Sequence, residues 1–276
     1  MTGMGEKSRV AMHDWLVQNG EDLRSAAVST GFRFGPRGAH TSRTMMLREL
    51  SLLLDGLPEG ASAQDYYHAA VDDNILQKGT AANRHSTYRH LREQYALNPE
   101  VAVFRVLRRL WALDAEGQPL LALLCALSRD PLLRATADPV LSTPLGEVLV
   151  RTRLADAMAL AFPGRLNPSV LDKTARNAAS SWTQAGHLQG QRVKTRRQPR
   201  ATPAAVAMAL WLGQHCGFVN EAALTSCWVA VLGVDSASLW PAVMASKRLG
   251  LVSARRTGDV VEVSVEGLDP GQGGSQ

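Results

Sequence analysis

The sequence predicts a mainly α-helical protein with two or three helix-turn-helix or winged-helix-like units that carry small β-hairpin wings. Three observations support this fold class. Helix starts are marked by a capping residue followed by proline, strand patterns are few and come late as short hairpins, and helices followed by a hairpin occur twice, in 149–200 and 201–268. A helix-rich chain with small hairpins is typical of proteins that present one helix to a partner.

The helix starts can be predicted one by one. A capping side chain accepts a free helix N–H, and proline fits the first helical position. This pattern occurs at Asn98-Pro99, Asp138-Pro139, Thr143-Pro144, Asn167-Pro168 and Thr202-Pro203. Ser62 followed by Asp65 also resembles a capping box, which predicts a helix over 63–71.

These signals divide the chain into successive segments. They predict a leader at 1–20, an N-terminal helix-turn-helix-like domain at 21–98, a helical connector at 99–148, a winged-helix-like domain at 149–200, a C-terminal winged-helix-like domain at 201–268, and a flexible Gly-rich tail at 269–276.

Composition narrows the classes of protein. The 276 residues are 45% hydrophobic, which is enough for a packed core and excludes wholesale disorder. The longest apolar run, Leu120 to Leu127, is too short to span a bilayer, so we expect no membrane partner. The first residues do not resemble a signal peptide and the three cysteines cannot all pair, which favours a reducing, cytoplasmic location.

Charge distribution is more informative than the net charge of +5. Three stretches hold basic residues and no acidic residue: Leu23 to Arg48, Lys173 to Asn220, and Ser236 to Gly258. Each falls on a helical or hairpin pattern. An anionic partner is therefore expected, although a basic run alone can also be a solvated face.

The clearest candidate site is the helix from Asn167 and the hairpin after it. At helical spacing, Lys173, Arg176, Ser180 and Thr183 form one polar stripe, opposite a face that includes Thr174, Ala178 and Ser181. In the following strand the bases alternate, so Arg192, Lys194 and Arg196 should share one exposed face, with Arg197 and Arg200 beyond them. This composition is typical of a winged-helix DNA reader, and the alternative is a solvated helix with a charged turn.

A second candidate helix spans Thr80 to Tyr95. Helices at Thr44 to Leu54 and Ala63 to Val71 would precede it in a trihelical helix-turn-helix arrangement. Its outward face would carry Asn83, Ser86, Thr87 and His90, with Arg89 and Arg92 at the sides, Lys78 just before it and Arg84 closer to the apolar side. Such side chains bind bases and phosphates, but the same motif also serves as a protein–protein scaffold.

The third candidate spans Ala204 to Val265. It should hold three helices, Ala204–Leu212, Glu221–Leu232 and Leu239–Leu249, and a hairpin with Arg255 and Arg256 at the wing tip. Because its last helix has few polar side chains, docking to a partner or to a second copy is at least as well supported as DNA reading.

Signatures of catalysis are missing from the sequence. No phosphate-binding loop, dinucleotide fingerprint, HExxH zinc motif or GxSxG nucleophile motif occurs. His215, Cys216 and Cys227 lack a fourth ligand at a known zinc spacing. We therefore expect no enzyme activity, no metal and no cofactor.

Several short motifs resemble the BrxA family. They are Asp72-Asp73-Asn74-Ile75-Leu76-Gln77-Lys78 followed by Thr80, Arg84 and Leu91-Arg92, the earlier Leu47-Arg48-Glu49-Leu50, and Leu120 to Leu124 leading into Arg129-Asp130. BrxA proteins are small accessory components of BREX bacteriophage-exclusion systems. The resemblance covers about 25–200 and leaves the segment from Thr202 onward as an addition. It implies a helical, winged-helix-containing protein, related in shape to the antitermination factor NusB, that binds DNA without catalysis.

The sequence therefore predicts a non-enzymatic, double-stranded-DNA-binding component of phage defence. Its expected partners are duplex DNA and other defence-system proteins, and a homo-oligomer is compatible with them. The alternatives are a winged-helix transcriptional regulator, which would need a dimer and a palindromic operator, an RNA-binding antitermination-like factor, and a purely structural adaptor. The 15 aromatic residues fall mostly on apolar faces, which disfavours single-strand RNA binding.

Overall fold

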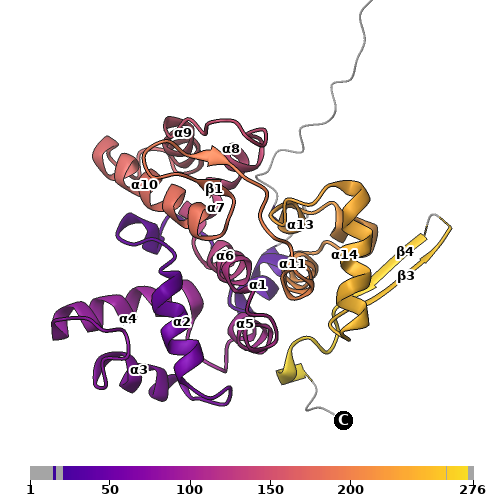
Figure 1. The fold of residues 1–276 in the computed structure, drawn as a ribbon, viewed down its shortest axis with the longest axis horizontal. Helices are drawn as coiled ribbons and strands as arrows, with labels where there is room; N and C mark the ends of the chain where they lie inside the picture. Colours follow the sequence, from indigo (N-terminus) through magenta and orange to yellow (C-terminus); the bar gives the residue numbers. More distant parts are fainter. Residues whose placement is uncertain (1–14, 17–20, 259, 273–276) are drawn as a thin grey trace, which may run out of the picture.

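The computed structural model describes residues 15–16, 21–258 and 260–272. It is mainly helical and contains two small antiparallel sheets, β1–β2 and β3–β4, which confirms the coarse fold prediction (Figure 1). No helix in this described part of the chain is long and apolar enough to cross a membrane.

The N-terminal helices match the predicted three-helix pattern closely. The elements are α1 (Glu21–Ser29), the 3-10 helix η1 (Ala39–Thr41), α2 (Leu47–Gly56), α3 (Ala63–Val71) and α4 (Ala81–Tyr95). Ser62 and Asp65 form the expected capping box, and the Thr80 side chain caps α4 by accepting the N–H of Asn83. Local capping chemistry thus determines where α3 and α4 begin.

The centre of the molecule is built from three apolar helices that pack on one another: α5 (Ala102–Leu113), α6 (Gln118–Arg129) and α11 (Pro203–His215). Leu120 to Asp130 are buried without interruption, and so are Ala204 to Gly213. Helices that are apolar on all sides must be enclosed by other elements. The remaining elements surround this centre, and a single apolar cluster runs from Trp15 to Leu268.

The segment after α6 includes residues 149–200, which the sequence predicts to be winged-helix-like. Its elements are α7 (Pro131–Arg134), α8 (Ala137–Leu141), α9 (Thr152–Ala161), α10 (Pro168–Gln184), β1 (Leu188–Gln189) and β2 (Thr195–Arg196). Asn167 caps α10, Pro168 is its first residue, and Gly186 follows its end with a φ of 84°, as the sequence predicts.

Three of the predicted cap–proline starts are wrong. The Asn98 side chain accepts the N–H of Glu100 in a turn, and α5 begins later, at Ala102. Helix α8 begins one residue before Asp138, and Thr143-Pro144 stands in a turn after it. Asn98 and Thr143 thus lie in turns and Asp138 lies inside α8, so none of the three side chains caps a helix start as expected. The pattern is correct only at Asn167 and Thr202.

The C-terminal elements are α12 (Glu221–Leu224), α13 (Cys227–Ala230), α14 (Ser236–Arg248), β3 (Ser253–Thr257), β4 (Val260–Ser264) and the 3-10 helix η2 (Pro270–Gln272). The single helix expected over Glu221–Leu232 is divided, because Ser226 lies outside both helices and caps α13. Arg255 and Arg256 are strand residues paired with Glu262 and Val261, so the prediction that they form the wing tip is wrong.

Both predicted chain ends need correction where the structure describes them. The leader at 1–20 lies outside the described residues except for Trp15 and Leu16, and Trp15 packs edge-on against Trp228 at 4.6 Å between ring centroids. Asp269, assigned to a flexible tail, is buried and holds Arg105 through two contacts of 2.7 Å. The packed part of the chain therefore extends further than its Gly-rich composition indicates.

Candidate nucleic-acid interface

Helix α10 carries the polar stripe that the sequence predicts. We call Lys173, Arg176, Ser180 and Thr183 the α10 surface; the first two are exposed and the last two half-buried. The opposite face is sealed, since Thr174, Ala178 and Ser181 are completely buried. The burial pattern of this helix is thus as predicted from helical spacing.

An acidic residue shares this side of α10. Asp172 lies 3.5 Å from Arg176 and 3.2 Å from Arg151, and all three side chains are about half exposed. Exposed ion pairs of this kind contribute about 0–1 kcal/mol. Arg176 can therefore exchange Asp172 for another anion at little cost. Arg151 is a neighbour that the sequence analysis did not single out.

The hairpin after α10 differs from the prediction. Arg192 is exposed and Lys194 is half-buried, with its Nζ donating to the Gly190 carbonyl at 2.6 Å, but Arg196 is buried. The Arg196 guanidinium donates to the carbonyls of His187 and Arg197. The prediction that Arg192, Lys194 and Arg196 share one exposed face is therefore wrong.

The burial of Arg196 has a long-range cause. Strand β2 is hydrogen-bonded on one side to β1 and on the other to the segment 146–149, with an antiparallel bridge between Val148 and Thr195. A strand that has neighbours on both edges is an interior strand. Burial also lowers the pKa of Lys194 and of Arg196.

The two bases beyond the hairpin behave differently from each other. Arg197 is exposed, and its Nε donates to Gln189 Oε1 at 2.5 Å, so its position is fixed beside β1. Arg200 makes an exposed ion pair of 2.6 Å with Glu116, in the loop before α6. Arg200 therefore points away from the hairpin that it was expected to extend.

On α4, the predicted outward face is only partly exposed. Asn83 and Arg89 are exposed and Arg84 is half-buried, whereas Thr87 and His90 are buried. The chain before α2 covers this face: Gln94 donates to the Thr44 carbonyl at 2.9 Å and Tyr95 to the Met45 carbonyl. The placement of Thr87 and His90 toward solvent is therefore wrong.

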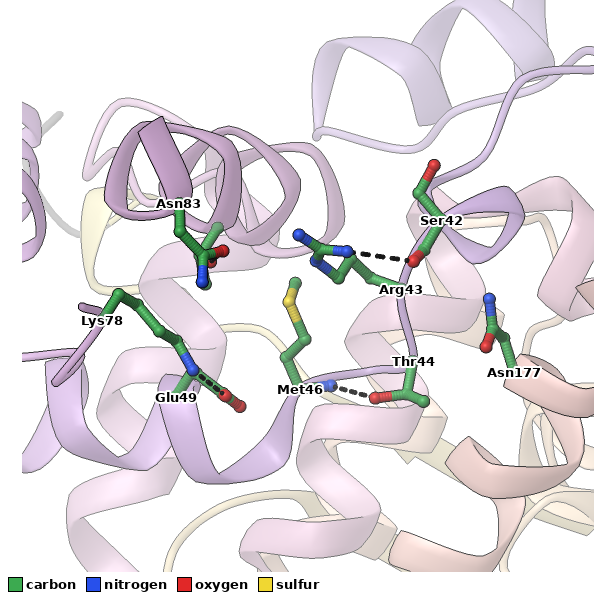
Figure 2. A pocket seen from close by; sticks show the side chains of 9 residues that line it. Ser42, Arg43, Thr44, Met46, Glu49, Lys78, Asn83 and Asn177 are labelled. Atoms are coloured by element: carbon green, nitrogen blue, oxygen red, sulfur yellow. Dashed lines mark hydrogen bonds and ion pairs between the residues drawn. The ribbon is translucent and has the colours of Figure 1, made fainter. Parts of the chain in front are cut away.

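A polar groove lies between α4 and α10. Its volume is about 420 Å³, and it is lined by Ser42, Arg43, Thr44, Met46, Glu49, Lys78, Asn83, Thr87 and Asn177. Figure 2 shows Lys78 and Asn83 on one side and Asn177 on the other, with the Arg43 side chain between them. The predicted site residues Lys78, Asn83 and Thr87 thus line one cavity together with Asn177 of α10, which is far away in the sequence.

The two cations of the groove, Lys78 and Arg43, differ in their ion pairing. Lys78 lies 2.7 Å from Glu49; burial alone would raise the pKa of this carboxyl, but the hydrogen bond and the charge of Lys78 hold it below its usual value. Arg43 contacts only the Ser42 carbonyl, at 3.4 Å, and has no carboxylate partner among the described residues. Arg43 is therefore the cation that is free to take an anion here.

The groove is continuous with the α10 surface. Asn177 follows Lys173 by four residues and precedes Ser180 by three, which makes these side chains neighbours on a helix. We call this continuous set, the α10 surface with Asn177 and Arg43, the polar strip. Arg43 and Asn177 were not among the predicted site residues, although Arg43 falls in the acid-free stretch from Leu23 to Arg48.

The C-terminal bases lie elsewhere. The β3–β4 hairpin stands at one edge of the molecule and α4 at the opposite edge (Figure 1). The Arg256 guanidinium covers the ring of Trp240 at 4.4 Å, and Arg255 faces Glu262 across the sheet. These two residues are therefore not part of the polar strip.

A buried chain of polar groups fixes the segment that forms one wall of the groove. His40 Nδ1 lies 2.7 Å from Asp130 Oδ2, and His40 Nε2 lies 2.8 Å from Ser181 Oγ. This order of groups resembles a hydrolase triad, but all three residues are sealed from solvent, and Ser181 Oγ already accepts the N–H of Met45 at 2.8 Å. No substrate can reach that hydroxyl, so the chain of groups is a structural connection.

No family model matches this chain, and no curated protein matches it either. Within the described residues, no three side chains of His, Cys, Asp or Glu come together in a way that could hold a metal ion. The function is therefore inferred from the geometry of the polar strip and from the sequence motifs.

Proposed function

We propose that the protein is a non-enzymatic double-stranded-DNA-binding accessory component of a BREX-type phage-defence system. The observation that carries this proposal is the polar strip. It joins Lys173 and Arg43, which have no carboxylate partner among the described residues, through the amide of Asn177. Lysine and arginine bind phosphates, and Ser, Thr and Asn side chains bind phosphates or base edges.

The order of elements around α10 supports a winged-helix interpretation. Helix α8 is followed by the extended stretch at Val148, then by α9, α10, β1 and β2, and Val148 pairs with β2. A winged helix has this order of elements, and its last helix enters the major groove while its hairpin contacts phosphates. In this interpretation α10 lies in the groove of the duplex, with Lys173 and Arg176 on the phosphates at the edge of the groove, Ser180 toward its floor, and Arg192 and Arg197 on the neighbouring backbone.

The proposed binding has little sequence preference. The strip is richer in cations than in amides: Asn177 is its one amide, beside the cations Arg43, Lys173 and Arg176. Phosphate contacts supply affinity without sequence information. Preference would then come from partner proteins rather than from this chain.

The C-terminal helices and hairpin serve a second role in this proposal. Helix α14 offers few polar side chains, and Arg256 is engaged on Trp240. We assign this unit to docking with another defence protein. The resemblance to BrxA supports the defence context, because accessory proteins of such systems act beside larger enzymes.

The proposal can be tested with purified protein and labelled duplexes of unrelated sequence. All duplexes should bind at similar protein concentrations. A preference above about a hundredfold for one palindrome, about 2.7 kcal/mol, would favour a transcriptional regulator instead. Tighter binding to single-stranded RNA than to duplex DNA would favour the antitermination alternative.

The defence assignment needs a test in cells. A strain that carries the complete defence system should lose phage resistance when Lys173 and Arg176 are both replaced by Ala, while the variant protein accumulates normally. Full resistance in that strain would contradict the role of the α10 surface in defence.

A further inference from the structure

A second cavity lies on the other side of α4, away from the polar strip. Its volume is about 330 Å³. Its wall is formed by α3, α4, the residues just before α5, the segment after α1 and the end of α6. The lining residues are Arg33, Ala63, Gln64, Tyr67, Tyr88, Arg92, Ala96, Leu97, Asn98, Val101 and Arg129. The wall holds three arginines and no Asp or Glu. Neither the proposed DNA contacts nor the buried connection at His40 uses it.

Arg129 is the most informative residue of this cavity. It is only 6% exposed, and its guanidinium donates to two backbone carbonyls, Glu93 O at 3.1 Å and Gly31 O at 2.5 Å. It has no carboxylate within ion-pair distance among the described residues. A buried cation without a counter-charge is costly, so an anion in the cavity would stabilise it.

The surroundings of Arg129 add to this demand for an anion. The pKa of Arg129 is lowered to about 10, mainly by burial; the charge of Arg33 also lowers it, whereas Cys125 and Glu93 act in the opposite direction, and the group stays charged at neutral pH. Arg92 is exposed on the same wall. Arg33 makes a weak ion pair with Glu93, at 3.9 Å between Nη1 and Oε1. Val101, the residue before α5, also lines the cavity, but the N–H groups of Val103 and Phe104 in the first turn of α5 already donate to the Thr30 and Val101 carbonyls.

Two tyrosines form part of the remaining wall. Tyr67 and Tyr88 meet edge to face with 5.3 Å between ring centroids; Tyr88 is buried and Tyr67 is half-exposed. A half-exposed ring beside arginines suits a planar base next to a phosphate. The cavity lies at the small end of the range of roughly 300–1,000 Å³ for ligand pockets, which fits a single nucleotide.

We propose that this cavity binds a nucleoside 5′-phosphate, with Arg33, Arg92 and Arg129 around the phosphate and Tyr67 against the base. The ligand is either a free nucleotide or the phosphorylated end of a single strand, since both present the same groups. The inference does not depend on duplex binding by the polar strip.

The test is calorimetric titration of the full-length protein, at constant ionic strength and without duplex DNA, using AMP, adenosine and inorganic phosphate as probes. AMP should bind at least about tenfold more tightly than adenosine or inorganic phosphate. Only AMP carries both a phosphate for the arginines and a base for Tyr67. Equal affinity for AMP and phosphate, or no binding of AMP at millimolar concentration, would overturn the proposal.

A variant and its control locate the site. Arg92→Gln should weaken AMP binding about tenfold, as expected for the loss of one charged contact, since this residue is exposed and its loss leaves the core intact. Arg165→Gln removes an equally exposed arginine from the loop between α9 and α10 and should leave the affinity unchanged. Equal affinities for AMP in the two variants would contradict the assignment of the cavity.

A competition experiment distinguishes the two sources of the ligand. A short single strand with a 5′-phosphate should displace AMP if a strand end is bound, whereas the same strand without the phosphate should not. Failure of both strands to displace AMP supports the free nucleotide. Displacement by the unphosphorylated strand would overturn the proposal, because the phosphate would then play no part in binding.

Discussion

His40 and Asp130 form a buried pair in which Nδ1 of the imidazole lies 2.7 Å from Oδ2 of the carboxylate. The same carboxylate also accepts the backbone N–H groups of His40, Leu132 and Leu133. Burial alone would raise the pKa of Asp130, but the charge and hydrogen bond of His40 hold it below its usual value. The pair ties the segment before α2 to the start of α7, and through Ser181 to α10.

Replacing His40 with Ala should lower the free energy of unfolding by about 3–5 kcal/mol, because it leaves a buried carboxylate without its counter-charge. Urea denaturation measures this change. Asp172→Ala is the matched control, since it removes a carboxylate from an exposed ion pair and should cost less than about 1 kcal/mol. A His40→Ala protein as stable as the control would contradict a structural role for the pair.

His187 should make stability depend on pH. It is buried, and burial lowers its pKa to about 3, with the charge of Arg196 contributing. The unfolded chain, with an ordinary histidine pKa of about 6.5, binds more protons between these values. The contribution of His187 is therefore complete above about pH 6.5 and is lost as the pH falls toward 3, by up to about 1.4 kcal/mol per pH unit.

The measurement is the free energy of unfolding between pH 7 and pH 4.5, compared with that of His187→Gln. The variant should lose less stability over this range than the wild-type protein, whatever its stability at neutral pH. Identical pH dependence in the two proteins would show that His187 is not held neutral by burial.

Asp269 should stabilise the fold although it stands near the Gly-rich end of the sequence. Asp269→Asn should lower the free energy of unfolding by about 1.5–3 kcal/mol, the usual range for a charged hydrogen bond, because its bond to Arg105 is bidentate and its side chain is buried. Glu116→Gln, which breaks the exposed pair with Arg200, should change it by less than about 1 kcal/mol. Equal effects of the two substitutions in thermal or urea unfolding would contradict this assignment.

Local signals predicted α10 well. The cap at Asn167, the proline after it, the glycine at 186 and the spacing of apolar residues all act within a few turns of one helix. Asp130-Pro131 carries the same cap–proline signal, and the Asp130 side chain caps α7, a helix start that was not among those predicted. That signal would have pointed to the residue that His40 contacts.

Contacts between segments far apart in the chain determine the burial of side chains that the local sequence pattern could not predict. Arg196 alternates with exposed bases, yet the pairing of Val148 with Thr195 encloses it. Thr87 lies on a polar helical face, yet the segment before α2 covers it. Periodicity shows which residues of an element share a face, whereas packing partners far away in the chain determine whether that face is buried.

The proposed function depends above all on contact between the α10 surface and the phosphates of duplex DNA. Its most direct test is the salt dependence of duplex affinity for the double variant Lys173→Ala with Arg176→Ala. Arg248→Ala with Arg255→Ala is the matched control, because it removes the same charge from exposed positions of α14 and β3. Circular dichroism should confirm that both variants are folded.

If Lys173 and Arg176 each neutralise one phosphate, the slope of log K against log[salt] should become shallower by about 1.8 in the α10 variant, since each contact contributes about 0.9. The slope of the control should match that of the wild-type protein. An unchanged slope in a folded α10 variant, or an equal change in the control, would contradict the account.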